Sequence, residues 1–249
     1  MAGKVYLVGA GPGKMDLITV RGLEILRQAD VVVYDYLVDK GILEEAKPQA
    51  ELICCDKLAN KGRYSDGSLI HQEKIHSLVV KKAKAGKNVV RLKNGDPSIF
   101  SRTSMELEAL IKNRVDFEIV PGVTAASLAS AFSGIPLTDR KYASACVFVT
   151  GHEDPKKKES ALDWKHLAHC GTIVLYMAFE RLNKIVKELQ RAGKPLDTPC
   201  ALIQDAGMIT QKLVIATLKD ISAKAKKQNL RPPVIIIIGI DFHSSLLRI

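Results

Sequence analysis

Short runs of β-branched residues alternate with helix-like segments along the first half of this 249-residue chain. Each run is apolar and bounded by charged or turn-forming residues, which is typical of a buried strand. Since a helical crossover joins parallel strands, the alternation predicts a mostly parallel sheet with helices on both faces. The five predicted strands are residues 5–8, 31–34, 52–55, 89–92 and 117–120.

Three helices are predicted between these strands from apolar residues spaced three or four positions apart. In the first, Val20, Leu23 and Leu26 share one face. Thr19 precedes that face and is placed to cap the helix N-terminus. The other two helices are expected around residues 75–82 and 105–111.

The second half of the chain has a different order of elements. Helices are expected over 124–132 and 181–192. Two of the strands are separated only by residues 205–212, which predicts an antiparallel hairpin and therefore a mixed sheet. The predicted fold is two α/β domains, 1–121 and 122–249, with the active site in a cleft between them. The strands expected in the second domain are 145–149, 172–176, 201–204, 213–217 and 234–240.

Composition restricts the partners of the chain. Lys and Arg number 37 against 27 Asp and Glu, so the net charge of +10 favours an anionic partner: nucleic acid, anionic lipid or a small substrate rich in carboxylate or phosphate. Aromatic residues are scattered, which argues against a surface that stacks single-stranded nucleic acid. Five cysteines without a C-x-x-C pair predict free thiols in the cytoplasm. The longest apolar run, 234–240, is too short to span a membrane, and no secretion signal is expected.

A glycine-rich loop at 9–13 follows the first predicted strand, where open α/β folds bind ligands. It does not match the dinucleotide fingerprint, which needs glycine where Lys14 stands. It does not match the phosphate loop either, because Val8 and Met15 occupy its glycine and hydroxyl positions. Asp35, at the end of the second strand, keeps a nicotinamide-dependent oxidoreductase open as an alternative.

Two further loops contain turn-forming residues at strand ends. Residues 91–97 carry Asn-Gly, Asp-Pro and a charged pair, and residues 120–124 join a strand to a helix N-terminus. If the strands are parallel, these loops and the glycine-rich loop lie at the same edge of the sheet. Their convergence predicts a ligand site there.

The chain resembles the tetrapyrrole (corrin and porphyrin) methyltransferase family over residues 5–239. The resemblance implies S-adenosylmethionine as methyl donor, S-adenosylhomocysteine as by-product and uroporphyrinogen III as acceptor, methylated at C2 and C7 to give precorrin-2, a precursor of sirohaem and cobalamin. It also implies a cytoplasmic homodimer with no membrane or nucleic-acid partner, and the substrate's eight carboxylates would account for the positive charge. The segments that carry it, in order, are VYLVGAGPGKMDLITVRG, ADVVVYDYLV, VVRLKNGDPSIF, VPGVTAAS, SGIPLTDR, FVTGHE and LRPPVIIIIG.

The same resemblance implies roles for individual residues. Asp35 matches the family's proton acceptor and Lys57 its proton donor. No metal is expected, because the methyl group of a sulfonium is already electrophilic and no histidine or cysteine spacing suggests a metal site. The residues that match the family's cofactor-binding positions are Pro12, Asn94, Gly95, Asp96, Ile99, Thr124, Ala125, Met177 and Ala206.

Some positions depart from the family pattern. Asn94 replaces a glycine, but asparagine tolerates left-handed backbone angles, so we expect the turn to form. Residues 101–106 lose the family's glycines while keeping Arg102 and Glu106, and Asp139 stands where histidine is common. These changes concern the substrate more than the methyl donor. Another corrinoid-pathway methyltransferase, the oxidoreductase and a basic nucleic-acid-binding module therefore stay open as alternatives.

Overall fold

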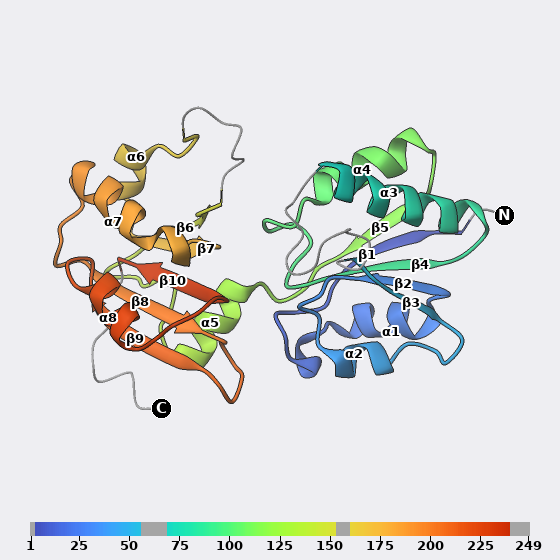
Figure 1. The fold of residues 1–249 in the computed structure, drawn as a ribbon, viewed down its shortest axis with the longest axis horizontal. Coiled ribbons are helices and arrows are strands. Elements are labelled where there is room, and N and C mark those ends of the chain that lie inside the picture. Colours follow the sequence, from blue (N-terminus) through green and yellow to red (C-terminus); the bar gives the residue numbers. More distant parts are fainter. Residues whose placement is uncertain (1–2, 56–68, 153–159, 240–249) are drawn as a thin grey trace. The chain divides into compact units, whose positions relative to one another are not determined.

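The computed structural model describes residues 3–55, 69–152 and 160–239. Close contacts divide the chain into two compact units, Met1–Ala125 and Ala126–Ile249, each with its own buried apolar core (Figure 1). This division falls a few residues after the boundary expected behind Pro121. The domain boundary itself stays a prediction, because compactness alone does not establish that a segment folds independently.

The first unit is built on a five-stranded sheet in which every neighbouring pair of strands is parallel. The strand order β3-β2-β4-β1-β5 confirms the parallel sheet expected from the alternating sequence pattern. Since all strands run the same way, their carboxyl ends and the loops that follow lie along one edge. The strands are β1 (Val5–Gly9), β2 (Val31–Tyr34), β3 (Glu51–Cys54), β4 (Val89–Lys93) and β5 (Phe117–Val120).

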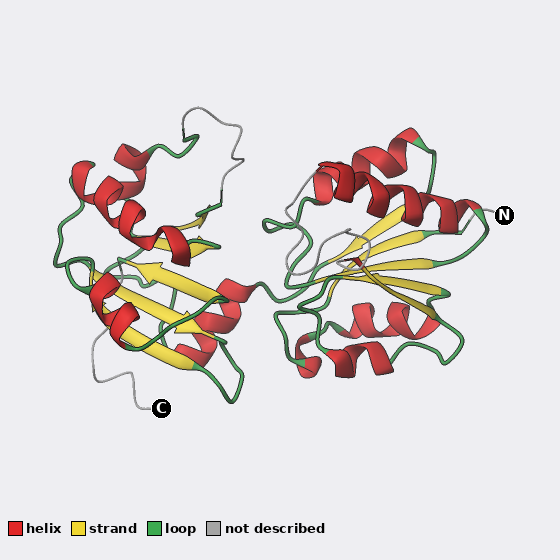
Figure 2. Ribbon diagram, in the orientation of Figure 1, coloured by secondary structure: helices red, strands yellow, loops and turns green. Residues whose placement is uncertain are grey.

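Helices cover both faces of this sheet (Figure 2). Successive side chains of a strand point to opposite faces, so Leu7 packs into a core with α3 and α4, and Val8 packs into another with α1 and α2. All residues of β4 are buried, because the strand lies inside the sheet with helices on each side. The helices are α1 (Val20–Gln28), α2 (Lys40–Glu44), α3 (Leu69–Lys84) and α4 (Thr103–Lys112).

Helix α1 begins where the sequence predicts but buries a different face. The side-chain oxygen of Thr19 accepts a hydrogen bond from Gly22 N at 3.1 Å, which confirms the N-cap. The predicted apolar face is confirmed at Leu26 but wrong at Val20, which is 75% exposed, and the buried residues are Gly22, Ile25 and Leu26. The reason is close packing at Gly22, where a Cβ would lie 3.0 Å from a methyl group of Val8. The helix therefore contacts the sheet through its glycine.

The second unit has a mixed sheet with the order β6-β7-β10-β8-β9. Strands β6 and β7 are parallel and the other pairs are antiparallel. The pairing of β8 with β9 confirms the hairpin predicted from the short connection between them. The strands are β6 (Cys146–Thr150), β7 (Thr172–Tyr176), β8 (Pro199–Gln204), β9 (Lys212–Thr217) and β10 (Val234–Ile238).

Helices also pack on both faces of the second sheet. Leu175 lies in a core with residues of α6, α7 and α8, whereas Tyr176, on the opposite face, accepts a hydrogen bond from Ala126 N at the start of α5. The helices are α5 (Ala125–Ser133), α6 (Trp164–Ala168), α7 (Leu182–Arg191) and α8 (Ile221–Lys227). Among the described residues, none of the helices has both the length and the apolar character needed to cross a membrane.

Candidate functional site

Loops follow β1, β4 and β5 at the carboxyl edge of the first sheet, and the first two are joined by their backbones. Gly95 N donates a hydrogen bond to Gly11 O at 2.8 Å, and Gly11 N donates to Gly95 O at 3.2 Å. Ala10 N also donates to Lys93 O at 2.8 Å. Beyond the parallel pairing of β1 and β4, an isolated antiparallel bridge between Gly11 and Gly95 therefore holds the two loops together.

The loop after β5 crosses the other two at glycines. A Cβ built on Gly122 would lie 2.3 Å from Gly95 O, and one built on Gly9 would lie 2.6 Å from the Gly122 Cα. A side chain at either position would have to displace backbone, so only glycine fits. The predicted convergence of the three loops is confirmed by these contacts.

Asp96 ties the loop after β4 to the loop after β5. Its Oδ1 accepts a hydrogen bond from Ser98 N at 2.7 Å, and its Oδ2 accepts one from Gly122 N at 2.9 Å. The residue is 9% exposed. Both carboxylate oxygens are thus used to brace the loops. Direct contact of Asp96 with a cofactor stays a prediction.

Gly13 and Gly95 both have a positive φ, but of the two only Gly13 faces open space, and Gly95 is buried. Gly13 has φ +102°, and a Cβ there would meet nothing within 4 Å. Gly95 has φ +73°, and a Cβ there would meet nothing closer than 3.9 Å. Asn94 does not adopt a positive φ, so its tolerance of left-handed angles is not used. The turn forms because the left-handed position is Gly95, which keeps its glycine.

Asp35 lies directly after β2 at the same edge, and both of its carboxylate oxygens have partners. Oδ1 is 2.5 Å from Arg91 Nη2, and Oδ2 accepts a hydrogen bond from Asn94 N at 3.2 Å. Burial alone would raise the pKa of Asp35, but the charges of Arg91 and Lys93 and these two hydrogen bonds lower it below its ordinary value. With a side chain still 32% exposed, Asp35 is an ionised, oriented carboxylate open to solvent.

Arg91, Lys93 and Glu106 form a buried charged cluster that was not predicted from the sequence. Arg91 Nε donates to Glu106 Oε1 at 2.8 Å, and Lys93 Nζ pairs with Glu106 Oε2. The two cations were interpreted as turn chemistry facing a ligand, but they point from β4 into the core. The sequence pattern around Arg91 and Lys93 could have indicated their burial. The two residues alternate with apolar residues in a buried strand, and a buried charge requires a partner.

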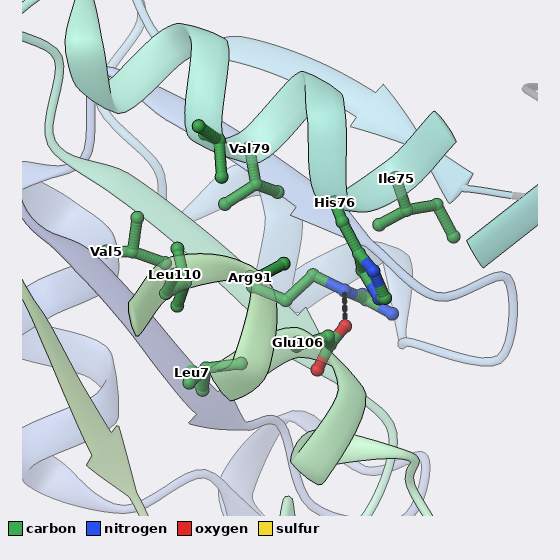
Figure 3. Close-up of a pocket in the computed structure, with 10 residues that line it drawn as sticks. Val5, Leu7, Ile75, His76, Val79, Arg91, Glu106 and Leu110 are labelled. Atoms are coloured by element: carbon green, nitrogen blue, oxygen red, sulfur yellow. Dashed lines mark hydrogen bonds and ion pairs between the residues drawn. The ribbon is translucent and has the colours of Figure 1, made fainter. Parts of the chain in front are cut away.

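A small cavity lies beside this cluster, lined by residues of β1, α3 and α4 (Figure 3). Its walls are mostly apolar side chains such as Leu7 and Val79, and His76, Arg91 and Glu106 also line it. Its volume is about 10 Å³, which leaves room for one water molecule. This cavity is therefore too small to hold a cofactor or a tetrapyrrole.

In the second unit, Met177 and Ala206 lie at one edge of the sheet. Met177 follows β7, has φ +51° and is 56% exposed. Ala206 lies in the turn after β8. Because β7 and β8 are both antiparallel to β10, their carboxyl ends share an edge. The start of α5 is at this edge as well, where Ala126 N donates to the Tyr176 hydroxyl at 3.2 Å.

The structure thus places the predicted site residues on two sheet edges. Lys57 lies outside the described residues, and the cleft expected between the domains stays a prediction. No group of three or more His, Cys, Asp or Glu residues placed to hold a metal ion occurs in the described part of the chain. The predicted residues that lie at or directly after the carboxyl ends of β1, β2, β4 and β5 are Pro12, Asp35, Asn94, Gly95, Asp96, Ile99 and Thr124, and Ala125 begins α5.

These features define a class: a two-unit α/β protein whose parallel sheet presents glycine-braced loops and the fixed carboxylates of Asp35 and Asp96 at its carboxyl edge. The model of the family Tetrapyrrole (Corrin/Porphyrin) Methylases matches residues 4–222. The chain belongs to this family.

Relatives of known function match nearly the whole chain. A uroporphyrinogen-III C-methyltransferase of Methanocaldococcus jannaschii is 45% identical over 96% of this chain and 96% of its own length. An S-adenosyl-L-methionine-dependent uroporphyrinogen III methyltransferase of Methanosarcina barkeri is 42% identical over 97% of this chain and 92% of its own length.

Solved structures have the same fold. A uroporphyrin-III C-methyltransferase of Thermus thermophilus, in complex with S-adenosylhomocysteine, matches with a TM-score of 0.79 and 36% identity, over 95% of this chain and 97% of that one. A cobalt precorrin-4 methyltransferase of cobalamin biosynthesis matches with a TM-score of 0.81 and 31% identity, over 95% of this chain and 94% of that one.

Proposed function

We propose that this protein is an S-adenosylmethionine-dependent C-methyltransferase that methylates uroporphyrinogen III at C2 and C7 to give precorrin-2, a precursor of sirohaem and cobalamin. Family membership and relatives of that activity at 42–45% identity support the proposal. The observation that carries the site assignment is the carboxyl edge of the first sheet. There, the loop after β4 contacts the ionised Asp35 through Asn94 N, and the loop after β1 has open backbone at Gly13.

The loops of that edge fit a methyl donor with a nucleoside and an amino-acid part. Backbone at Gly13 faces open space, so a ligand can approach the main chain there without meeting a side chain. Pro12 precedes this glycine, Asn94 precedes the buried Gly95, and Ile99 lies further along the same loop. We assign contacts with the donor to these three residues. In the second unit, the exposed Met177 side chain and the turn at Ala206 supply further contacts to the donor.

Bound S-adenosylmethionine supplies an electrophilic methyl group, so the chain's own residues have to orient the acceptor carbon and move protons. We assign to Asp35 the acceptance of a proton as the methylated pyrrole rearranges, and to Lys57 the donation of one. The geometry of Asp35 supports its part, because the carboxylate is ionised, solvent-accessible and held by two hydrogen bonds.

The charge of the chain suits this substrate. A net charge of +10 attracts an octacarboxylate electrostatically. We propose a cytoplasmic homodimer. The family resemblance supports it, and so do the five cysteines, none of which forms a disulfide, since disulfides are rare in a reducing compartment. Light scattering of the purified protein measures its mass in solution, and the mass of a single chain would contradict the dimer.

A methyltransferase for a later corrinoid precursor is the second candidate. It is favoured by the TM-score of 0.81 to the cobalt precorrin-4 methyltransferase. The departures at Asn94, residues 101–106 and Asp139 also concern the acceptor rather than the donor.

Anaerobic incubation with S-adenosylmethionine and uroporphyrinogen III, read by mass spectrometry, tests the proposal. We expect a product heavier by two methyl groups, and Lys57→Ala and Asp35→Asn should each lower turnover. Binding of S-adenosylhomocysteine without methylation would contradict the proposed substrate and favour the second candidate. If the protein neither bound nor methylated, the enzymatic assignment would be wrong.

A further inference from the structure

Two cations belong to an otherwise apolar strand. Arg91 lies in the middle of β4 and Lys93 at its end, and their exposed fractions are 5% and 1%. The other residues of β4 are buried as well. Burying a charge costs free energy unless it is paired and hydrogen-bonded. An apolar pair at these positions would pack the strand equally well. The presence of two buried cations therefore needs a reason other than the stability of the sheet.

These cations belong to a row of alternating charges that begins at the site. Asp35 pairs with Arg91 at 2.5 Å, Arg91 pairs with Glu106 at 2.8 Å, and Glu106 pairs with Lys93. Only the Asp35 end is open, with its side chain 32% exposed, whereas those of Arg91 and Glu106 are each 6% exposed. Three of the four charges thus have no direct access to a ligand and act on the site through Asp35.

The guanidinium of Arg91 is held in one orientation. Its Nη1 donates to Leu92 O at 3.2 Å and to Val33 O at 3.4 Å, its Nε donates to Glu106, and its Nη2 reaches Asp35. Every guanidinium nitrogen of Arg91 has an acceptor, so this group cannot rotate without losing several hydrogen bonds. The carboxylate of Asp35 is therefore fixed from the interior of the protein.

We propose that Arg91 is a positioning residue for methyl transfer, which holds the Asp35 carboxylate in one orientation, with Glu106 and Lys93 fixing Arg91 in turn. The proposal rests on the proposed function, in which Asp35 accepts the proton. It names residues that contact neither donor nor acceptor. A proton acceptor is effective only at hydrogen-bond distance from the proton it takes, and a fixed carboxylate keeps that geometry.

The charges around Asp35 give the sign of the expected pH effect. Arg91 and Lys93, both on β4, are the cations that act on Asp35. Three further titratable groups lie near these cations: Glu106 on α4, His76 on α3 and Cys55 directly after β3. Burial lowers the pKa of His76, so its imidazole is neutral at pH 7 and adds no charge. Without Arg91, burial would dominate and the pKa of Asp35 would rise. The acid limb of the kcat profile would then move to higher pH.

The test compares Arg91→Met, Arg91→Lys and Asp35→Asn, alone and as the double variant Asp35→Asn/Arg91→Met. Arg91→Met should lower kcat by about 100-fold, on the scale of a lost acid–base group. It should shift the acidic side of the pH–kcat profile to higher pH. The affinity for S-adenosylhomocysteine, measured by calorimetry, should stay within about twofold of the wild-type value. Arg91→Lys should restore part of kcat. Arg21→Met is the matched control, because Arg21 also pairs with a glutamate at 2.8 Å but is 57% exposed.

The double variant separates positioning from an independent role. If Arg91 acts through Asp35, the double variant should be no slower than Asp35→Asn alone. If Arg91→Met slowed the Asp35→Asn variant as much as it slows the wild-type enzyme, the proposal would be overturned. An unchanged acidic side of the pH–kcat profile in Arg91→Met would overturn it as well. Should Arg91→Met fail to fold, Arg91→Gln replaces it, because it also removes the cation and the same shift to higher pH is expected. Full activity of Asp35→Asn would instead refute the role of Asp35 in the proposed function.

Discussion

Each unit of the protein buries a lysine, and the two lysines are satisfied differently. Lys93 in the first sheet pairs with the carboxylate of Glu106 in a row of four charged side chains. Lys194, which follows α7 in the second unit, donates to the backbone carbonyls of Ala168 at 3.0 Å and Cys170 at 3.2 Å. Lys194 thereby caps the end of α6 and involves no second charge.

The difference shows what a buried charge contributes in each place. A lysine bound to carbonyl groups serves local structure, and its loss affects a helix end. A lysine in a row of side-chain charges supports the position of the outermost member, Asp35, which lies at the site. The first unit thus combines buried charges and glycine contacts at its functional edge. The second rests on an apolar core that includes Leu175 and Leu189.

The largest effect is expected for Lys93→Met. The change leaves Glu106 with one cation fewer in a buried setting, which costs about 3–5 kcal/mol in the free energy of unfolding. Urea denaturation followed by circular dichroism measures it. Lys82→Met is the control, since Lys82 pairs with Glu51 at 2.5 Å on the surface and should cost about 1 kcal/mol or less. Equal losses would contradict the distinction between buried and exposed pairs.

Gly122→Ala should cost about 1–3 kcal/mol, because its Cβ would lie 2.3 Å from Gly95 O and force the loops apart. Binding of S-adenosylhomocysteine, measured by calorimetry, should be lost. Gly193→Ala in the second unit is the control: its φ of +94° strains an alanine, but the Cβ meets nothing within 4 Å. Retained binding in Gly122→Ala would show that the braced loops do not shape the donor site.

Lys194→Met should cost about 1 kcal/mol, on the scale of the hydrogen bonds lost to the two carbonyls. Trp164 is the single tryptophan, begins α6 and packs against the core of the second unit. Its fluorescence during urea denaturation therefore reports on the unit that the change affects. The kcat should stay at the wild-type value, in contrast to Lys93→Met. A loss of turnover would place Lys194 in the functional machinery.

The smallest effect is expected for Asp220→Asn. Hydrogen bonds from Thr217 N and from the side chains of Lys224 and Thr217 lower the pKa of Asp220 to about 2. The folded-state pKa lies below the ordinary value near 3.9, so the contribution to stability exists above about pH 4 and disappears as the pH falls through 2. The urea midpoint of the variant should lie slightly below wild type at pH 6 and coincide with it near pH 2. A difference independent of pH would rule out this ionisation as the cause.

Much of the fold was predictable because each strand corresponds to a short apolar run in the local sequence. In the described part of the chain, all ten strands coincide with short apolar runs, and the brief link at 205–212 indicated the hairpin. The short helices α2, α6 and α8 were not predicted, since five to seven residues are too few for a helical period to emerge. The loops of the site were recognisable from Gly, Asn and Asp-Pro at strand ends. Their family roles came from the resemblance.

The amino-acid sequence by itself determined the two α/β units, the parallel and mixed sheets and the edge at which the loops converge, because period and turn chemistry are local properties. Only the tertiary structure decided which way a given side chain faces. It placed Arg91 and Lys93 in the core, set Asp96 to brace two loops and buried Gly22 in place of Val20. These outcomes depend on contacts between residues far apart in the chain, and no local pattern records such contacts.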